Sequence, residues 1–410
     1  MIKLNHFKGK RMCTSMSKQS LLTLFNQFLW GGVLTGFVFV SFAQANTETL
    51  SFKDPQLEKA VLKLLPVDTP LTLGNVNQIE SADLSNANIR YLDGIEALSN
   101  LKKLSLNNNQ IEDVQPLAAL SALTNLSLNK NQISNIDALS SLNNLQGFAI
   151  EHNKITNVQV VKHWPNIRGL DISINQITSL EGVKNNDSVV AIWASHNAIC
   201  DLTPLESITN LIILAIADNC FDDLSALKNN RGLVELTLAN NRLSNITQLS
   251  SLTSIERLDI SNNFIQDLSI LSSFTQLRWL DARYNLIDDL TPLANLKLLE
   301  KLMLGQNRIR DIAVLAGAPQ LKWLVVGGNL LSSAESLKSM PNLVNADVTY
   351  NRINIDNANW QKTVNQLSHN LKVLSYTPQQ PRAMHSDIPG AQPRQQDFDA
   401  QLLKDNSGDR

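Results

Sequence analysis

The chain is poor in the residues that usually build metal centres and disulfide frameworks. It has 3 cysteines and 6 histidines among 410 residues, and aromatic residues make up only 5%. So few cysteines in so long a chain do not amount to a disulfide framework. The histidines never approach metal-ligand spacing with a cysteine or with one another, so no zinc motif is present. We therefore expect no metal site, and nothing in the sequence indicates a cofactor.

Excess positive charge is also missing. The first 45 residues carry five of the 35 Lys and Arg residues and no acidic residue. Without them, 30 basic residues face 37 acidic ones, a formal net charge of −7. A chain of this balance lacks the basic surface that attracts a phosphate backbone, which excludes nucleic acid as the expected partner.

Long apolar runs are confined to the N-terminus. The run from about Phe28 to Ala43 follows a basic start and ends in Ala43-Gln44-Ala45, as is typical of a secretory signal. We predict a signal peptide at 1–45, so that the mature protein is secreted, periplasmic or on the cell surface. The alternative is a membrane anchor that stays uncleaved, because Leu21–Ala43 is long enough to span a bilayer.

Asparagine recurs at a fixed interval of 22 residues through most of the chain. A period of about 20 to 29 residues that carries L-x-x-L-x-L-x-x-N-x-L is the signature of a leucine-rich repeat. The predicted fold is an α/β solenoid, a horseshoe with a continuous parallel sheet on its concave face. The asparagines of this ladder are Asn109, Asn131, Asn153, Asn175, Asn197, Asn219, Asn241, Asn263, Asn285, Asn307, Asn329 and Asn351.

Apolar residues surround each asparagine in a constant pattern, as Leu104, Leu106 and Ile111 do around Asn109. The alternation of the two leucines is that of a strand and directs both into the interior. The asparagine amide offers a donor and an acceptor to the loop backbone of its own and the adjacent turn. Its loss should leave buried polar groups without partners, at roughly 1 to 3 kcal/mol. We therefore interpret these asparagines as structural.

About 13 repeats span 79–356, because a degenerate repeat with Ala87 at the asparagine position opens the array. Before it, Asp54 and Pro55 begin an amphipathic segment, which predicts a helical N-terminal cap at 46–78.

After the array, Trp360, Val364 and Leu367 recur at helical spacing and predict a C-terminal cap helix at 357–376. The last residues, 377–410, are rich in Pro, Gln and Asp and lack apolar periodicity. We expect them to form a disordered tail.

Two cysteines, Cys200 and Cys220, lie in adjacent turns but two residues out of register. An extended-strand estimate places their α-carbons about 8 Å apart, beyond the ~7 Å limit for bridging without backbone movement. Free thiols and a strained bridge both remain open.

Outward-facing strand positions are the candidates for function, because the hydrophobic core does not need them. They change from small and polar in the first repeats to large and charged in the later ones. Aromatic residues and arginine dominate interface hot spots, which predicts a protein partner on the concave face. The alternative is that these are ordinary isolated exposed side chains. The candidates are Trp193, Arg257, Asp259, Trp279, Asp281, Arg283, Tyr284, Met303, Trp323 and Tyr350.

An enzymatic interpretation has one piece of support, the neighbouring carboxylates Asp259 and Asp281, about 5 Å apart on adjoining strands. Arg257 and Arg283 are expected close enough to neutralise both. The sequence contains no nucleophile motif such as G-x-S-x-G, and no histidine is near. We expect no catalysis.

The array resembles the 22-residue repeats of bacterial internalins. Asp201-Leu202-Thr203-Pro204-Leu205 and the equivalent stretches at 113–117 and 289–293 match the internalin D-[ILV]-x-P-L step, and Phe52-Lys53-Asp54-Pro55 is similar to the internalin cap. The resemblance covers about Phe52–Ile353. It implies a surface or secreted recognition protein whose concave sheet holds a partner, often a host receptor, although a repeat specifies the scaffold better than the ligand.

The sequence departs from that family in having no L-P-x-T-G signal, so wall anchoring is not expected. Two other functions remain as alternatives. The solenoid could be a structural spacer in the envelope, or a regulator similar to the eukaryotic phosphatase-regulating repeat protein of the same period, if the chain is not exported. We expect a monomer.

Overall fold

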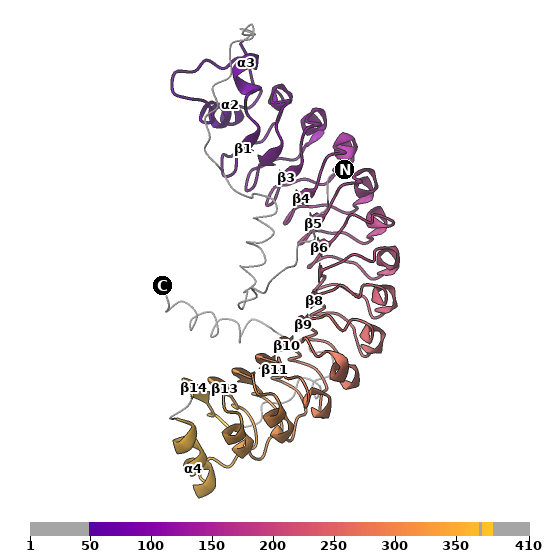
Figure 1. Ribbon diagram of the computed structural model, residues 1–410. Coiled ribbons are helices and arrows are strands. Elements are labelled where there is room, and N and C mark those ends of the chain that lie inside the picture. Colours follow the sequence, from indigo (N-terminus) through magenta and orange to yellow (C-terminus); the bar gives the residue numbers. More distant parts are fainter. Residues whose placement is uncertain (1–48, 369–370, 380–410) are drawn as a thin grey trace, which may run out of the picture.

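The computed structural model describes residues 49–368 and 371–379. The expected signal peptide at 1–45 and residues 380–410 of the expected tail lie outside these ranges. Figure 1 shows a curved solenoid, with the strands along its inner side and short helices along its outer side. Within the described ranges, no helix combines the length and apolar character needed to cross a bilayer.

A parallel sheet of 14 strands in chain order forms the concave face, which confirms the predicted fold class. Each strand has three residues, of which the middle one points into the interior and the outer two point to the concave face. Neighbouring strands pair at an offset of one period, as Leu280 does with Leu258 and Leu302. The strands are β1 (Ser81–Asp83), β2 (Lys103–Ser105), β3 (Asn125–Ser127), β4 (Gly147–Ala149), β5 (Gly169–Asp171), β6 (Ala191–Trp193), β7 (Ile213–Ala215), β8 (Glu235–Thr237), β9 (Arg257–Asp259), β10 (Trp279–Asp281), β11 (Lys301–Met303), β12 (Trp323–Val325), β13 (Asn345–Asp347) and β14 (Val373–Ser375).

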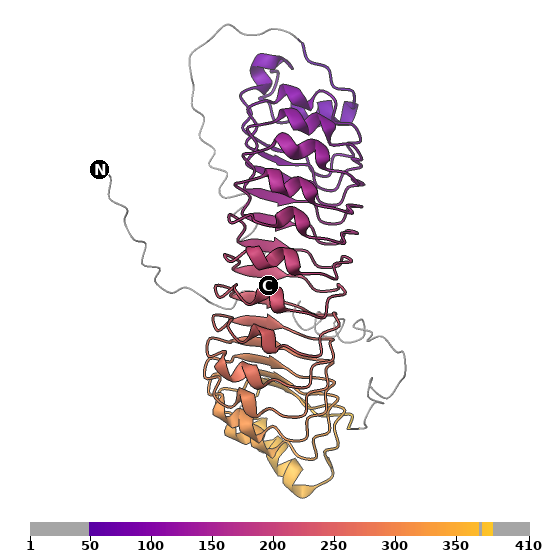
Figure 2. The same cartoon turned by 90° about the vertical axis from the view of Figure 1, so that its right-hand side faces the viewer.

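Short 3-10 helices stack on the convex side, facing the viewer in Figure 2. A polar residue precedes most of them and accepts a backbone N–H two residues later, as Asp201 does from Thr203 at 2.8 Å. This side-chain hydrogen bond starts the turn. They are η1 (Ile95–Ala97), η2 (Gln115–Ala119), η3 (Asp137–Ser141), η4 (Gln159–His163), η5 (Glu181–Val183), η6 (Thr203–Ser207), η7 (Ser225–Leu227), η8 (Thr247–Leu249), η9 (Ser269–Ser273), η10 (Thr291–Leu293), η11 (Ala313–Gly317) and η12 (Glu335–Ser339).

The ladder asparagines connect consecutive turns through their amides. The Oδ1 of Asn131 accepts the N–H of Ile111 at 3.1 Å, and its Nδ2 donates to the carbonyls of Leu106 and Leu128 at 3.0 and 2.9 Å. The residue before each asparagine adopts a left-handed conformation, such as Lys130 with φ 56°. Each amide therefore satisfies the backbone groups that a sharp turn after the strand would otherwise leave buried without partners.

The N-terminal cap contains helices α2 (Pro55–Leu62) and α3 (Leu73–Val76). Asp54 joins it to the first turn, because its carboxylate accepts the N–H groups of Gln56, Arg90 and Tyr91 at 2.8, 2.6 and 3.0 Å. Burial alone would raise the pKa of Asp54, but these backbone hydrogen bonds hold it below its ordinary value of 3.8.

At the C-terminal end, helix α4 (Ala358–Leu367) stops well before residue 376, which corrects the expected length of the cap helix. The chain then forms β14, and Leu374 pairs with Ala346, an offset of 374 − 346 = 28 residues. The offset exceeds one period because α4 takes up the extra residues. The array thus gains a final strand that the regular period does not predict.

A disulfide joins Cys200 and Cys220, with a Cα–Cα distance of 4.6 Å, so the estimate of about 8 Å from the sequence was wrong. That estimate extended the strand register into the following turn. There the register slips, because the N–H of Cys220 donates to the carbonyl of Ile199 at 3.0 Å. The slip brings Cys220 beside Cys200.

Candidate functional site

Four residues at the first position of β9 to β12 form a column in which cations and indoles alternate, here named the inner column: Arg257, Trp279, Lys301 and Trp323. The Arg257 guanidinium lies 5.0 Å from the Trp279 ring centroid, and the Lys301 ammonium lies 5.6 Å from that of Trp323. Each cation therefore leans toward the indole of the next strand. Both indoles are half-buried, and Lys301 is exposed.

Glu235, at the first position of β8, adds a negative charge next to Arg257 in the same column. The Nε of Arg257 lies 3.8 Å from a carboxylate oxygen of Glu235. This corrects the expectation that Arg257 neutralises Asp259, which lies in a different column of the sheet. The reason is geometric, since side chains at the same position of adjoining strands are close neighbours in a parallel sheet.

The carboxylate pair behaves differently from the prediction. Asp281 is only 1% exposed, because Arg283 lies against it with Nε 3.0 Å from each carboxylate oxygen and Nη2 2.7 Å from Oδ2. Residues i and i+2 of an extended chain share a face, so the guanidinium can fold back onto its own strand. Asp281 is therefore a poor candidate for direct contact with a partner, and it fixes the position of Arg283.

Asp259 pairs in register with Asp281 and is half-buried. Burial and, next, the charge of Asp281 raise the pKa of Asp259 to about 7, against the lowering effect of Ser261 and Arg283. The Ser261 hydroxyl and N–H donate to its Oδ1 at 2.7 and 3.0 Å. The pKa of this carboxyl is thus raised well above that of an ordinary aspartate.

Met303 ends β11, and the two tyrosines lie in the turns that follow β10 and β13. Met303 adjoins Asp281 across β10 and β11. Tyr284 and Tyr350 each precede a ladder asparagine in the left-handed conformation, with φ of 54° and 52°. Between their turns lie Gly305 and Gly327, which are both buried, and a Cβ at Gly305 would lie 3.2 Å from the Gly327 carbonyl oxygen. The adjoining turns are therefore closely packed at these two glycines.

Trp193 does not join this group. It lies at the third position of β6, next to Asp171 on β5 and Ala215 on β7. Burial raises the pKa of Asp171 to about 6. The nine other candidates come from β9 to β13 and the turns that follow these strands, so the structure divides the predicted set into one cluster and one separate tryptophan.

A second charged column flanks the cluster and was not predicted. Arg278 contacts Glu256 at 3.4 Å and Glu300 at 3.1 Å, and Lys322 contacts Glu300 at 2.9 Å. The hydrogen bond from Lys322 is the largest cause that lowers the pKa of Glu300. These residues immediately precede β9 to β12, and their alternating sign at 22-residue spacing was the signal available in the sequence. Their ion pairs therefore lie directly beside the inner column.

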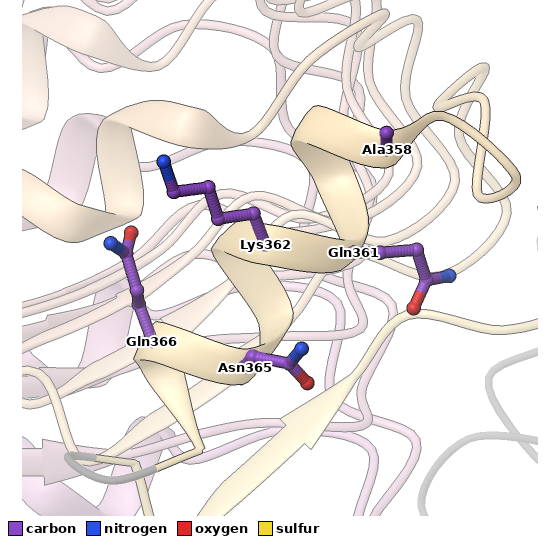
Figure 3. Close-up of a pocket in the computed structure, with 5 residues that line it drawn as sticks. All are labelled: Ala358, Gln361, Lys362, Asn365 and Gln366. Atoms are coloured by element: carbon purple, nitrogen blue, oxygen red, sulfur yellow. The ribbon is translucent and has the colours of Figure 1, made fainter.

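A different surface feature lies on the outer side of α4. Ala358, Gln361, Lys362, Asn365 and Gln366 line a shallow hollow there, shown in Figure 3. The lining has amides and one ammonium but no aromatic residue, so it lacks the anchors that dominate protein recognition. The concave cluster of β9 to β13 is the stronger candidate.

Comparisons with known families agree with this architecture. One family model, described as leucine-rich repeat, matches residues 43–173, and a second, described as leucine-rich repeats in two copies, matches residues 231–273. No sequence among the curated proteins matches the chain.

Three examples illustrate the similarity to solved structures. An internalin from Listeria monocytogenes is 28% identical, with a TM-score of 0.75, over 80% of this chain and 96% of that one. A leucine-rich repeat protein from Leptospira interrogans is 20% identical, with a TM-score of 0.64, over 78% and 98%. The ectodomain of a plant membrane receptor kinase from Arabidopsis thaliana, in complex with Casparian strip integrity factor 2, is 21% identical, with a TM-score of 0.59, over 68% and 37%.

Proposed function

Because the chain is an internalin-like leucine-rich repeat protein, we propose that it is a non-enzymatic recognition module that holds a protein partner on its concave sheet. Similar architecture binds a protein ligand in the Arabidopsis receptor ectodomain. That likeness supports the class of function and leaves the partner's identity open.

The inner column is the observation that carries this proposal. Tryptophan and arginine are the side chains most enriched among binding hot spots. The cation–π contacts at 5.0 and 5.6 Å hold both indoles in place before a partner arrives, which reduces the entropy lost on binding. Trp279 and Trp323 are thus proposed as the anchors. Arg257, Lys301, Arg283, Tyr284, Met303 and Tyr350 would surround them.

Export is part of the proposal. Three observations support it: the basic and apolar N-terminal segment, the similarity to an internalin, and the Cys200–Cys220 disulfide. Disulfides persist mainly in oxidising compartments outside the cytosol. We therefore propose that the protein acts outside the cytoplasm, either secreted, in the periplasm or on the cell surface.

The carboxylate arrangement supports a role without catalysis. A hydrolytic carboxylate pair needs both groups to reach a substrate, whereas Arg283 covers Asp281 with a bidentate contact. Asp259 alone cannot supply the two carboxylates that such a reaction needs. Its role in the proposed surface is that of a polar neighbour.

The test compares the full-length protein with a Trp279→Ala, Trp323→Ala double variant. Both would be immobilised, and proteins retained from envelope extract and from host-cell lysate would be identified by mass spectrometry. The matched control is Tyr91→Ala, because Tyr91 is an exposed aromatic with cation–π contacts to Lys53 and Arg90 at the opposite end of the solenoid.

We expect a protein that the wild type and Tyr91→Ala retain and the double variant loses, with a cost of about 2 kcal/mol or more per tryptophan. Thermal unfolding should be nearly unchanged, because neither indole belongs to the buried core. Equal retention by all three proteins would refute the concave-face site and favour the structural spacer.

A further inference from the structure

The residue that follows each ladder asparagine forms a second row, on a different side of the solenoid. Here the chain has left the strand and has not yet reached the following 3-10 helix, so the row lies in the turns between the concave and convex sides. Consecutive members lie in adjacent repeats that are hydrogen-bonded to each other. The N–H of Leu286 donates to the carbonyl of Ile265 at 2.9 Å, and the N–H of Arg308 donates to that of Ile287 at 2.8 Å. The edge row of the later repeats is Arg242, Phe264, Leu286, Arg308, Leu330 and Arg352.

The same row is polar or small in the earlier repeats, where its members are Gln110, Gln132, Lys154, Gln176 and Ala198. Nothing in the scaffold therefore requires arginine or a large apolar side chain at this position. The core is filled by the next residue along, such as Ile265, which is fully buried. The change of chemistry is thus a property of the later repeats alone.

One apolar side chain of the edge row is exposed to solvent, and two others are partly accessible. Phe264 is 58% exposed, and Leu286 and Leu330 are half-buried. Phe264 and the half-buried Leu286 in the next repeat form a small apolar patch, which Arg308 separates from Leu330. Such a patch is typical of an interaction surface.

The arginines of the edge row are available for a partner's charge. Within the part of the chain that the structure describes, Arg242, Arg308 and Arg352 form no ion pair. Of the residues three positions after these arginines, only Asp311 is acidic, and it accepts the N–H of Ala313 in its own turn at 2.8 Å. The row thus offers guanidinium groups beside apolar contacts.

We propose that the edge row is a second docking surface, independent of the concave face, and that it binds an extended acidic protein segment in which carboxylates alternate with apolar side chains. Arginine presents a planar fork that binds a carboxylate in a bidentate manner. Over five rungs of ~4.8 Å, the row from Arg242 to Arg352 is about 24 Å long.

An anionic membrane is the less suitable occupant. Attraction to lipid headgroups uses lysine as readily as arginine, but the three cations of the row are all arginine. Insertion into a bilayer would also need several protruding apolar side chains, whereas Leu286 and Leu330 are half-buried. A row of arginines at fixed spacing, each able to bind a carboxylate in a bidentate manner, therefore fits a peptide better than a membrane.

The experiment uses the full-length protein and a fluorescent synthetic peptide in which Glu alternates with Leu and Phe, measured by fluorescence anisotropy. The test variant is Arg242→Gln, Arg308→Gln, Arg352→Gln. Glutamine is the residue that the same row carries in three earlier repeats, so this variant should fold. The other arms are Trp279→Ala with Trp323→Ala, a peptide with Lys in place of Glu, and vesicles of phosphatidylcholine with phosphatidylglycerol.

We expect the wild type and the tryptophan variant to bind the acidic peptide equally, and the glutamine variant to bind at least about tenfold more weakly. The lysine peptide should not bind. A photo-crosslinking residue at position 264 should capture the acidic peptide, and the same residue at position 176 should not.

Equal affinity for the glutamine variant, or binding of the lysine peptide, would overturn the proposal. Loss of binding in the tryptophan variant alone would assign the peptide to the concave face instead. Binding to the vesicles without binding to the peptide would replace a protein partner with a membrane. Because the two surfaces are varied separately, failure here leaves the concave-face function untouched.

Discussion

The side-chain Oε1 of Gln379 accepts the backbone N–H of Ile353 at 3.4 Å, the same contact that Asn351 makes with Leu331 one turn earlier. Its Nε2 donates to the carbonyl of Val348 at 2.9 Å, and its Oε1 also accepts the N–H of Asn351 at 3.1 Å. A glutamine thus takes the place of a ladder asparagine beside the last strand. Residues 377–379, expected to begin a disordered tail, belong to the fold.

Replacing Gln379 by Ala should destabilise the C-terminal turn, because the N–H of Ile353 and the carbonyl of Val348 would lose their partner. We expect a loss of roughly 1 to 3 kcal/mol in the free energy of unfolding, measured by urea denaturation. The control is Gln366→Ala on the outer face of α4, which should change stability by less than about 0.5 kcal/mol. Equal effects would show that Gln379 has no capping role.

Replacing Asn230 by Leu should stabilise the protein. Asn230 is fully buried, and neither polar atom of its side chain has a hydrogen-bond partner within the described residues. The equivalent position one turn later holds Leu252, so leucine fits the interior there.

We expect a gain of about 1 to 3 kcal/mol, seen as a higher midpoint of thermal unfolding. Asn186→Leu is the matched variant, because the Nδ2 of Asn186 donates to the carbonyl of Trp164 at 3.0 Å. It should gain less, or lose stability. A larger gain at Asn186 would contradict this account.

The raised pKa of Asp259, about 7 against an ordinary value of 3.8, predicts a dependence of stability on pH. The folded state binds the proton more tightly than the unfolded state, so this group disfavours folding increasingly as the pH rises from about 4 to about 7. Asp259→Asn should therefore match the wild type near pH 4 and be more stable at pH 8, by about 1 to 3 kcal/mol.

The comparison variant for this pH dependence is Asp347→Asn. Asp347 accepts the N–H and the hydroxyl of Thr349 at 2.9 and 2.8 Å, as Asp259 does from Ser261. Urea denaturation at both pH values should show the gain at Asp259 only. A gain that is the same at pH 4 and pH 8 would exclude titration as its cause.

Removing the disulfide with Cys200→Ser, Cys220→Ser should lower the free energy of unfolding by about 2 to 4 kcal/mol, because the bridge restricts the unfolded chain. Dithiothreitol should lower the thermal midpoint of the wild type to that of the double variant and leave the variant unchanged. A wild type insensitive to the reductant would show that the bridge contributes nothing to stability.

The fold could be predicted almost completely from the sequence, because one physical rule repeats. The asparagine period fixed the pairing of β2 to β13, and the alternation of apolar residues fixed which side chains are buried. The prediction from the sequence fails where the 22-residue period ends. At β14, the insertion of α4 breaks the period, and at Gln379 a glutamine makes the contacts of an asparagine.

The candidate surface was less predictable, because strand position gives the face of a side chain but not its partner. The period placed Trp279 and Trp323 two rungs apart in one column. It could not show that Arg283 folds back onto Asp281, or that Arg257 turns to Glu235 and not to Asp259. Both outcomes depend on rotamers of long side chains, which the backbone pattern leaves open.

The constant 22-residue offset from β1 to β13 has a consequence for inheritance. A gene segment that encodes one period begins and ends in equivalent backbone positions, so recombination between two such segments inserts or deletes a whole strand in register. The distance between the N-terminal cap and the tryptophans can change in this way while every local contact of the inner column is kept. The number of repeats before the tryptophans and the side chains of the inner column can therefore change independently of each other.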